Sequence, residues 1–261
     1  MNSFNIYIFV KIFFLMRVIC LIPARLESTR LPNKMLKLVN EYPLIVQTYL
    51  SAKNTHVFDD VWVVTDNKDI GKAIEAVGGQ VFYNLEQHAS GSDRIAEAAK
   101  KMEADIIVNV QGDTPLVNKN NMQSLIDCFL SDKDKKISLA SLMTKIDGTE
   151  QNPNVVKVIV DQDNFALYFS RSVIPYKRDT LSDVPYHKHI GVYAFRKEAL
   201  LDFAKSEQTP LEKAELIECL RYLENGKKIK MVYTDDVSIE VDTQEDLDKA
   251  IAYFKSNQHV E

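Results

Sequence analysis

The stretch that decides the fold is Arg17-Val-Ile-Cys-Leu-Ile22, followed at once by the loop Pro23-Ala-Arg-Leu-Glu-Ser-Thr-Arg-Leu-Pro-Asn-Lys34. After its arginine the first segment is entirely apolar, as expected of a strand that is buried on both faces in a parallel sheet. The loop carries the cations Arg25, Arg30 and Lys34. Open α/β sheets bind their ligands beyond the carboxyl ends of their strands. The stretch therefore predicts an α/β protein that binds an anion next to its first strand.

The rest of the first half repeats this pattern of short β-branched runs and segments of helical period. Strands are predicted at Val18–Ile22, Val61–Thr65, Gln80–Tyr83 and Ile106–Val110. Helices are predicted at Leu44–Ala52, at Asp69–Val77 before the stop Gly78-Gly79, and along the stripe Met122, Leu125, Ile126, Phe129 and Leu130. Nearly continuous apolar strands that alternate with helices favour a mostly parallel sheet flanked by helices.

The second half of the chain changes character. Strands are predicted at Val155–Val160, Phe165–Phe169 and Ile190–Phe195, separated by loops rich in Pro, Asp and Lys. Fewer helices are expected between them, which predicts an added antiparallel layer. Because no linker or internal repeat is visible, we expect a single domain over residues 17–261.

Composition narrows the class of protein. The chain has 261 residues, of which 46% are hydrophobic and 26% charged, and this is ordinary for a globular protein with its own core. The net charge of −5 argues against a broad basic face for nucleic acid. The cysteines, Cys20, Cys128 and Cys219, include no CxxC pair. They predict neither a zinc site nor a disulfide framework, and they fit a reducing cytoplasm.

The N-terminal segment needs a separate interpretation. The apolar runs Ile6–Val10 and Ile12–Leu15 are separated by Lys11, and they are too short to span a bilayer. They are not followed by the small-residue cleavage site of a secretory signal. We interpret residues 1–16 as a non-native extension from a mis-assigned start codon, with Met16 as the biological first residue, and we expect no membrane partner.

The cations of the first loop favour a phosphate ligand. Neither GxGxxG nor GxxxxGK[ST] occurs in the sequence, so side-chain cations would have to replace the backbone cradles of those motifs. Together Arg25, Arg30 and Lys34 suit a triphosphate. The alternative is a solvated basic turn, which the flanking prolines, Pro23 and Pro32, and the position after a strand disfavour.

A second candidate loop is Ser90-Gly-Ser-Asp-Arg94, which precedes a helix that we expect to begin near Ser92. A serine or the aspartate of this loop would cap that helix. A helix N-terminus with Arg94 in its first turn also suits an anion or the hydroxyls of a ribose. We therefore predict that Ser90 and Arg94 contribute to nucleotide binding.

Two aspartates far apart in the chain predict a metal site. Asp113 follows the predicted strand Ile106–Val110, and Gly112 beside it allows a ligand to come close to the backbone. A carboxylate that holds Mg²⁺ is usually helped by another oxygen ligand. Asp242 is the best partner, and we predict that Asp113 and Asp242 share one Mg²⁺. The alternatives are a plain turn at Asp113 and a helix cap at Asp242.

The segment after Asp242 predicts a closing helix. The sequence Thr243-x-x-Asp246 is a capping box. The apolar face of the helix would consist of Leu247, Ala250, Ile251 and Phe254. Because Thr243 already supplies the cap, Asp242 is left available for a ligand.

Several ordered segments of the chain resemble those of a known enzyme family. They are Ile22-Pro-Ala-Arg25, Ser28-Thr-Arg-Leu-Pro32 with Lys34, Ser90-Gly-Ser-Asp-Arg94, Asn109-Val-Gln-Gly-Asp113, Ala166-Leu-Tyr-Phe-Ser-Arg171, His189-Ile-Gly-Val-Tyr193, Pro210-Leu-Glu212 and Val241-Asp-Thr243. From Arg17 to about Ile251 the chain resembles the 3-deoxy-manno-octulosonate (Kdo) cytidylyltransferases, also called CMP-Kdo synthetases. Motifs in this order at consistent spacing make the resemblance specific.

The resemblance implies a Rossmann-like nucleotidyltransferase sheet, a homodimer, and an antiparallel layer that serves sugar binding and dimerisation. It implies that the enzyme transfers CMP from CTP to the anomeric hydroxyl of Kdo, releases pyrophosphate, and serves lipopolysaccharide biosynthesis in the cytoplasm. On this implication Arg25, Arg30 and Lys34 hold the CTP phosphates while Asp113 and Asp242 ligate Mg²⁺, and these are the catalytic residues.

The resemblance also implies a pocket for the eight-carbon ulosonic acid. Gln111 would lie between the nucleotide and this sugar. The pocket would be lined by Arg171, His189, Tyr193 and Glu212. Such polar groups suit a substrate with one carboxylate and many hydroxyls, because the carboxylate needs a cation and the hydroxyls need donors and acceptors.

Departures from the common family pattern leave two candidates for the sugar substrate. Thr114 and Cys219 stand where many members have Glu and Gln. The segments Tyr186-His-Lys-His-Ile-Gly191 and Ser238-Ile-Glu-Val-Asp242 resemble the branch that activates the 8-amino-3,8-dideoxy analogue of Kdo. In that alternative an acid such as Glu240 or Glu215 would pair with the sugar's ammonium group.

Two further alternatives belong to other classes. A non-catalytic nucleotide-binding module would have kept the fold without turnover, and the intact Asp113 and Asp242 disfavour it. A sialate-type cytidylyltransferase would resemble a Gly-Gly-Ser-Lys version of the opening loop, whereas this chain has Leu26-Glu-Ser-Thr-Arg30.

Overall fold

The computed structural model describes residues 16–28, 30–84, 90–148, 150–179, 184–236 and 239–257. The rest of the N-terminal extension, residues 1–15, and Ser238 of the analogue-like segment lie outside the described residues. The chain divides into two compact units, of which the first comprises residues 1–123 and 237–261 and the second comprises residues 124–236. The expectation of a single domain stays a prediction.

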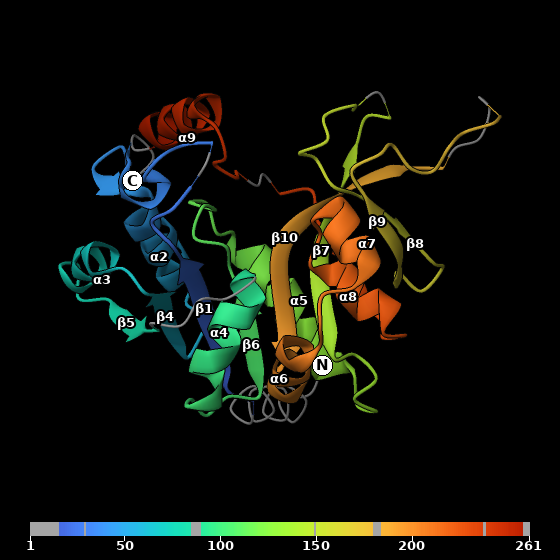
Figure 1. Ribbon diagram of the computed structural model, residues 1–261, viewed down its shortest axis with the longest axis horizontal. Helices are drawn as coiled ribbons and strands as arrows, with labels where there is room; N and C mark the ends of the chain where they lie inside the picture. The colour runs from blue at the N-terminus through green and yellow to red at the C-terminus, as the bar shows by residue number, and fades with distance from the viewer. Residues whose placement is uncertain are drawn as a thin grey trace, which may run out of the picture. The chain divides into compact units, whose positions relative to one another are not determined.

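The first unit is built on parallel strands. The strand β1 (Val18–Ala24) lies between β4 (Asp60–Thr65) and β6 (Ile106–Asn109), and β5 (Gln80–Tyr83) pairs with β4 (Figure 1). All residues of β1 and β6 are buried, which explains their nearly continuous apolar sequence. Because parallel strands end at the same edge, the loops that follow β1, β4 and β6 open side by side.

Helices connect these strands. They are α2 (Leu44–Asn54), α3 (Lys68–Glu75) and α4 (Gly91–Lys100), and α2 follows a short 3-10 turn η1 (Lys34–Leu36) and the hairpin β2 (Leu38–Val39) and β3 (Tyr42–Pro43). The side chain of Asn67 caps α3 by accepting hydrogen bonds from the backbone N–H groups of Asp69 and Ile70. Gly78 has a φ of 69°, the left-handed conformation that the predicted helix stop requires.

The closing helix α9 (Gln244–Asn257) begins at the predicted capping box. The hydroxyl oxygen of Thr243 accepts from the backbone N–H of Asp246 at 3.2 Å, and the Asp246 carboxylate accepts from the backbone N–H of Thr243 at 2.9 Å. This reciprocal pair satisfies N–H groups that a helix start leaves without intrahelical partners.

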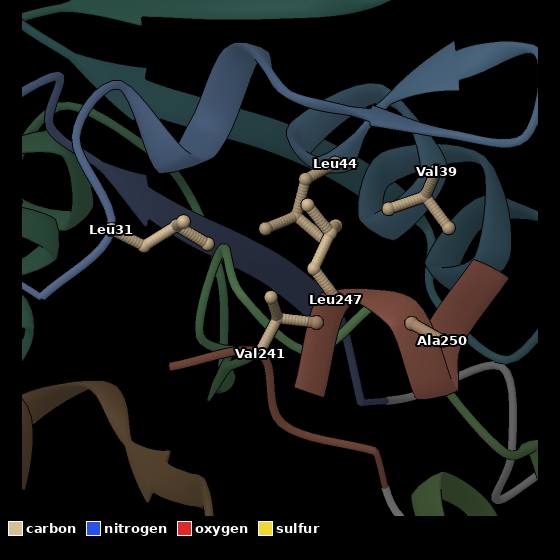
Figure 2. Close-up of a cluster of buried hydrophobic side chains, with 6 residues drawn as sticks. All are labelled: Leu31, Val39, Leu44, Val241, Leu247 and Ala250. Atoms are coloured by element: carbon tan, nitrogen blue, oxygen red, sulfur yellow. The ribbon is translucent and has the colours of Figure 1, made fainter. Parts of the chain in front are cut away.

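A hydrophobic cluster joins α9 to the opening loop. It consists of Leu31, Val39, Leu44, Val241, Leu247 and Ala250, all of them buried (Figure 2). The side chains of Ile251 and Phe254 pack against it and are partly buried. Leu31 is the neighbour of Arg30, and Val241 is the neighbour of Asp242. The cluster therefore places a predicted phosphate ligand and a predicted metal ligand against the same helix.

The second unit contains the predicted antiparallel strands. The strands β7 (Leu139–Ile146) and β10 (Tyr186–Arg196) are antiparallel, as are β10 with β8 (Lys157–Val160) and β8 with β9 (Ala166–Ser170). The strand β11 (Lys230–Tyr233) pairs with β7 in parallel. The added layer is thus antiparallel with one parallel edge, and neither β7 nor β11 was predicted.

The second unit also has more helix than the sequence analysis predicts. The helix α5 (Lys119–Ser131) enters it from the first unit, and α6 (Lys197–Lys205), α7 (Pro210–Glu215) and α8 (Cys219–Glu224) follow β10. On α5 the predicted stripe is buried except for Leu130, which is half-buried. Within the described ranges, no helix is long and apolar enough to cross a bilayer.

Candidate active site

A cavity of about 280 Å³ lies in the first unit, at the carboxyl ends of β1 and β6. The residues that line it include every predicted nucleotide and metal ligand, namely Arg25, Arg30, Lys34, Ser90, Arg94, Gln111, Asp113 and Asp242. This edge of the parallel strands is where α/β sheets bind ligands. Residues distant in sequence are therefore brought to one cavity, as predicted, while their individual roles stay predictions.

Lys34 lies between the two predicted metal ligands. Its Nζ donates to Asp113 Oδ2 at 2.6 Å and to Asp242 Oδ1 at 3.1 Å. Only 8% of the Lys34 side chain is exposed. Burial lowers the pKa of Lys34, but the charges of both carboxylates and the hydrogen bonds to them outweigh burial and raise it above its ordinary value. The ammonium is therefore charged, and it is shared by two acids.

Arg30 adds a second cation at the same acid. Its Nη2 lies 3.1 Å from Asp242 Oδ1, and 51% of the Arg30 side chain is exposed. Arg30 thus pairs with a carboxylate at the cavity that it helps to line. Cations arranged around two carboxylates in this way suit a ligand that carries both negative charge and a metal ion.

Backbone contacts hold the two acidic segments together. The N–H of Val241 donates to the carbonyl of Asp113 at 2.9 Å. The hydroxyl of Thr48 on α2 donates to the carbonyl of Gly112 at 2.9 Å. The segment of Asp113 is therefore fixed by α2 on one side and by the segment before α9 on the other.

The loop before α4 adopts the predicted cap. Ser90 is the N-cap of α4, and its hydroxyl oxygen accepts from the backbone N–H of Asp93 at 3.1 Å. Arg94 lies in the first turn of α4 and pairs with Asp66 at 3.3 Å. Asp66 was not predicted as a site residue, although it follows the predicted strand Val61–Thr65 directly, much as Asp113 follows the predicted strand Ile106–Val110.

Among the predicted sugar ligands, Arg171 and Glu212 are held by other groups of the second unit. Arg171 donates from Nε to the carbonyl of Glu215 at 2.6 Å, and from its two Nη atoms to the carbonyls of Pro153 and Leu216. The carboxylate of Glu212 accepts two hydrogen bonds from Arg221, at 2.7 and 2.8 Å. These contacts give both residues a structural role, and their sugar roles stay predictions.

His189 and Tyr193 lie together on β10. Their ring centroids are 5.4 Å apart, and each residue is 6% exposed. Burial, with a smaller contribution from Lys188, lowers the pKa of His189 to about 3. The imidazole is therefore neutral at physiological pH and takes part in hydrogen bonds as a neutral ring.

Comparison with known proteins assigns the chain to a family. The cytidylyltransferase family model matches residues 19–229. A 3-deoxy-manno-octulosonate cytidylyltransferase of Christiangramia forsetii is 51% identical over 236 residues, which cover 90% of this chain and 95% of that protein. The enzyme of the same name from Flavobacterium johnsoniae is 50% identical over 242 residues, which cover 92% of this chain and 99% of that protein.

The chain belongs to the 3-deoxy-manno-octulosonate cytidylyltransferase family.

Solved structures agree with this assignment. A CMP:2-keto-3-deoxy-manno-octonic acid synthetase in complex with CTP is similar with a TM-score of 0.86 and 34% identity, covering 92% of this chain and 99% of that one. A 4-diphosphocytidyl-2C-methyl-D-erythritol synthase from Anaerococcus prevotii shares the fold at a TM-score of 0.62 and 16% identity, covering 92% and 99% of the two chains. The α/β class and Rossmann-like sheet predicted for this cytidylyltransferase are thereby confirmed.

The carboxylates of this cytidylyltransferase that face Lys34 are also its candidate metal ligands. The carboxylates of Asp113 and Asp242 both contact the buried ammonium of Lys34, so their negative charges favour a cation at this position. Mg²⁺ is commonly held by one or two carboxylates, with water and substrate phosphates completing its shell. Among the described residues no group of three or more His, Cys, Asp or Glu could hold a metal. The pair Asp113 and Asp242 fits a Mg²⁺ that is bound together with a nucleotide.

The cytidylyltransferase cavity leaves no room for a side chain at Gly112. A Cβ there would lie 2.9 Å from the carbonyl oxygen of Pro23, 3.1 Å from Ile45 and 3.2 Å from Met35. We expect Gly112→Ala to lower the free energy of unfolding by about 1–3 kcal/mol and to weaken CTP binding, because the strand ends must move apart. Denaturant titration and calorimetry with CTP measure both quantities.

Gly226→Ala is the matched control for this prediction. Nothing lies within 4 Å of a Cβ at Gly226, but its φ of 70° strains an alanine backbone. We expect this variant to lose stability without losing CTP affinity. Equal CTP affinity in the Gly112→Ala variant and the wild type would contradict the predicted link between the close packing at Gly112 and CTP binding.

Proposed function

We propose that this protein transfers CMP from CTP to the anomeric hydroxyl of Kdo and releases pyrophosphate. The observation that carries the proposal is the cavity in which Arg30 and Lys34 meet Asp113 and Asp242 at distances of 2.6 to 3.1 Å. The two relatives that are about half identical over nine-tenths of the chain carry the name of this activity. Because the cavity offers charges for a nucleotide and a metal, catalysis fits the site better than a non-catalytic binding module does.

In the proposed reaction the anomeric oxygen of the sugar attacks the α-phosphorus of CTP. The bond between that phosphorus and the oxygen that bridges the α- and β-phosphates breaks, and pyrophosphate leaves. The proton of the sugar hydroxyl passes to solvent. Arg25, Arg30 and Lys34 bind the phosphates and stabilise the charge that moves onto the leaving group. We assign no general base, because positioning and charge stabilisation supply most of the rate in phosphoryl-type transfers.

Mg²⁺ is part of the proposal, with Asp113 and Asp242 as its protein ligands. When bound, the ion supplies positive charge that polarises the phosphates and orients them. Lys34, whose ammonium contacts both carboxylates, would bind the phosphates beside the ion.

We also propose a homodimer, a cytoplasmic location and a role in lipopolysaccharide biosynthesis. The second unit exposes large apolar side chains, among them Leu167 at 59% and Leu216 at 78%, and a second copy of the chain would cover such groups. Cys20, Cys128 and Cys219 are all free thiols, which agrees with a reducing compartment. Light scattering of the purified protein measures the oligomeric state.

The names of the relatives favour Kdo over its 8-amino analogue. Within the second unit, Glu215, one of the acids considered for the analogue, already accepts from the hydroxyl of Ser170 and the backbone N–H of Arg171, at 2.7 and 2.9 Å. A carboxylate engaged in this way is a poor partner for a further ammonium group.

The test is pyrophosphate release from CTP and Mg²⁺ with each sugar in parallel. We expect turnover with Kdo, slower turnover with the 8-amino analogue, and none without a sugar. Faster turnover with the analogue than with Kdo would show that the analogue is the preferred substrate. No release with either sugar, in a protein that still binds CTP, would favour the non-catalytic module.

A further inference from the structure

The charges that meet at the two proposed metal ligands of the first unit are balanced. Asp113 and Asp242 contribute two carboxylates, and the cations of Lys34 and Arg30 contact them at 2.6 to 3.1 Å. The side chains of Asp113 and Asp242 are only 25% and 34% exposed, so water screens these charges in part. A divalent ion that joined this group would add two positive charges that none of its carboxylates balances.

The backbone holds both carboxylates in place. The carbonyl of Asp113 accepts from the N–H of Val241 at 2.9 Å, and the N–H of Asp242 donates to the carboxylate of Asp246 at 3.2 Å. Both acids therefore reach Lys34 from fixed segments, and an oxygen of each lies within 3.1 Å of its Nζ. Two carboxylates held this close repel each other unless a cation accompanies them. The ammonium of Lys34 is that cation.

The ammonium contacts the same oxygens that a metal ion would need. These are Asp113 Oδ2 and Asp242 Oδ1, which accept from Lys34 Nζ. Mg²⁺ binds carboxylate oxygens directly, at about 2.1 Å. An ion bound to both oxygens would stand beside the ammonium, and like charges at such a separation repel each other. Without another source of negative charge, the ammonium and a metal ion therefore compete for this pair of acids.

The charges around the cavity favour an anion over a free metal ion. Among the described residues that line the cavity, four are cationic and three are acidic. Asp66, which pairs with Arg94 at 3.3 Å, brings the acids only to an equal number. Such a lining does not attract a divalent cation, whereas a bound triphosphate adds several negative charges and can complete the shell of the ion. The charged lining residues are Arg25, Glu27, Arg30, Lys34, Arg94, Asp113 and Asp242.

We propose that the ammonium of Lys34 excludes a divalent cation from Asp113 and Asp242 until a nucleotide occupies the cavity, so that the metal enters together with the phosphates of CTP. This inference rests on the proposed function, in which the two aspartates ligate Mg²⁺. Lys34 then acts on the metal as well as on the phosphates. Occupancy of the metal site follows the nucleotide and does not follow the concentration of free metal ion.

The test is a titration with Mn²⁺ in the absence of nucleotide, followed by electron paramagnetic resonance of the free ion. We expect Lys34→Met to bind Mn²⁺ at least about tenfold more tightly than the wild type. The reason is that one charge within 4–6 Å changes the proton affinity of a carboxylate by about 10- to 1,000-fold. Adding Asp113→Asn to Lys34→Met should abolish the gain. Equal Mn²⁺ affinity in the wild type and Lys34→Met, or a gain that survives Asp113→Asn, would overturn the proposal.

Two further variants separate charge from other effects of the substitution. Lys249→Met is the matched control, because Lys249 pairs with a single exposed acid, Glu245, at 2.7 Å on α9. We expect its Mn²⁺ affinity to equal that of the wild type. Lys34→Arg keeps a cation at the site, and we expect it to bind Mn²⁺ as weakly as the wild type does. Binding by Lys34→Arg as tight as that by Lys34→Met would contradict the role of the charge.

The wild type provides the test if Lys34→Met does not fold. Enhanced relaxation of water protons distinguishes Mn²⁺ on the protein from Mn²⁺ on free CTP, and we expect this enhancement only when CTP is present. The same enhancement without nucleotide would overturn the exclusion by Lys34 and leave the proposed function intact. No enhancement even with CTP would overturn the proposed metal site, and the inference with it.

Discussion

Asp113→Asn is expected to lower kcat for pyrophosphate release by about 10²–10³-fold, the usual cost of one electrostatic group in an active site. The carboxylate of Asp113 lies 2.6 Å from Lys34 Nζ and lines the cavity. Asparagine keeps the shape and one oxygen but removes the negative charge that a divalent cation requires. Initial rates with saturating CTP, Kdo and Mg²⁺ measure the effect.

The backbone contacts of Asp113 make this variant a clean test. The carbonyl of Asp113 accepts from Val241, and this contact does not depend on the side chain. Lys34 keeps Asp242 as a partner at 3.1 Å, so the nearly buried ammonium is not left alone. We therefore expect thermal unfolding close to that of the wild type, together with weakened binding of Mn²⁺ in the presence of CTP.

Asp248→Asn is the matched control. Asp248 is an exposed carboxylate on α9 that accepts from the side chain of Gln244 at 2.9 Å, away from the cavity. The same chemical change there should leave kcat unchanged. A kcat of Asp113→Asn within about tenfold of the wild-type value would contradict the proposed catalytic role of Asp113.

The second large effect concerns stability. Arg221→Met is expected to lower the free energy of unfolding by about 3–5 kcal/mol, because it leaves the buried charge of Glu212 without its partner. The side chains of Arg221 and Glu212 are 2% and 4% exposed. Arg221 also stacks over the ring of Phe203, 4.4 Å from its centroid. Urea unfolding followed by circular dichroism measures the loss.

The paired variant Glu212→Leu with Arg221→Met separates folding from sugar binding. Replacing both members of a buried ion pair by apolar groups is often neutral or stabilising, so we expect the pair to recover most of the lost stability. If Glu212 also binds the sugar, as the family resemblance implies, the refolded double variant will have a raised KM for Kdo. An unchanged KM would show that Glu212 serves the fold alone.

Lys205→Met is the control for the ion-pair prediction. Lys205 pairs with Asp202 on the surface of α6 at 3.3 Å, and 74% of its side chain is exposed. Exposed pairs contribute little to stability. A loss at Arg221 no larger than the loss at Lys205 would contradict the role assigned to the buried pair.

The first unit follows closely from local sequence signals. The strand β5 has the predicted bounds Gln80–Tyr83, and the capping box of α9 forms as predicted. The proximity of Asp113 and Asp242 was predictable because one follows a buried strand and the other precedes a capped helix. Strand ends and helix caps both depend on short local sequence patterns, so both positions can be predicted from the sequence.

The structure of the second unit is harder to predict from the sequence, because its contacts are set by tertiary geometry. The strand β7 contains Ser141 and Thr144 among its apolar residues, and this masks the apolar run that indicates a buried strand. Ser141 contacts His189 at 2.9 Å next to a bulge in β10 between Ile190 and Tyr193, which no local pattern predicts. Likewise, Glu212 on α7 meets Arg221 on α8 across a turn in which Leu216 adopts a left-handed conformation with a φ of 53°.

The contact between Lys34 and Asp242 joins residues 208 positions apart. During translation the opening strand and the basic loop leave the ribosome long before Asp242 is made. A nascent chain therefore has the arginines and lysine of the cavity but lacks Asp242, one of the two acids that contact Lys34. The segment that leads into the last helix thus supplies the second carboxylate that contacts Lys34.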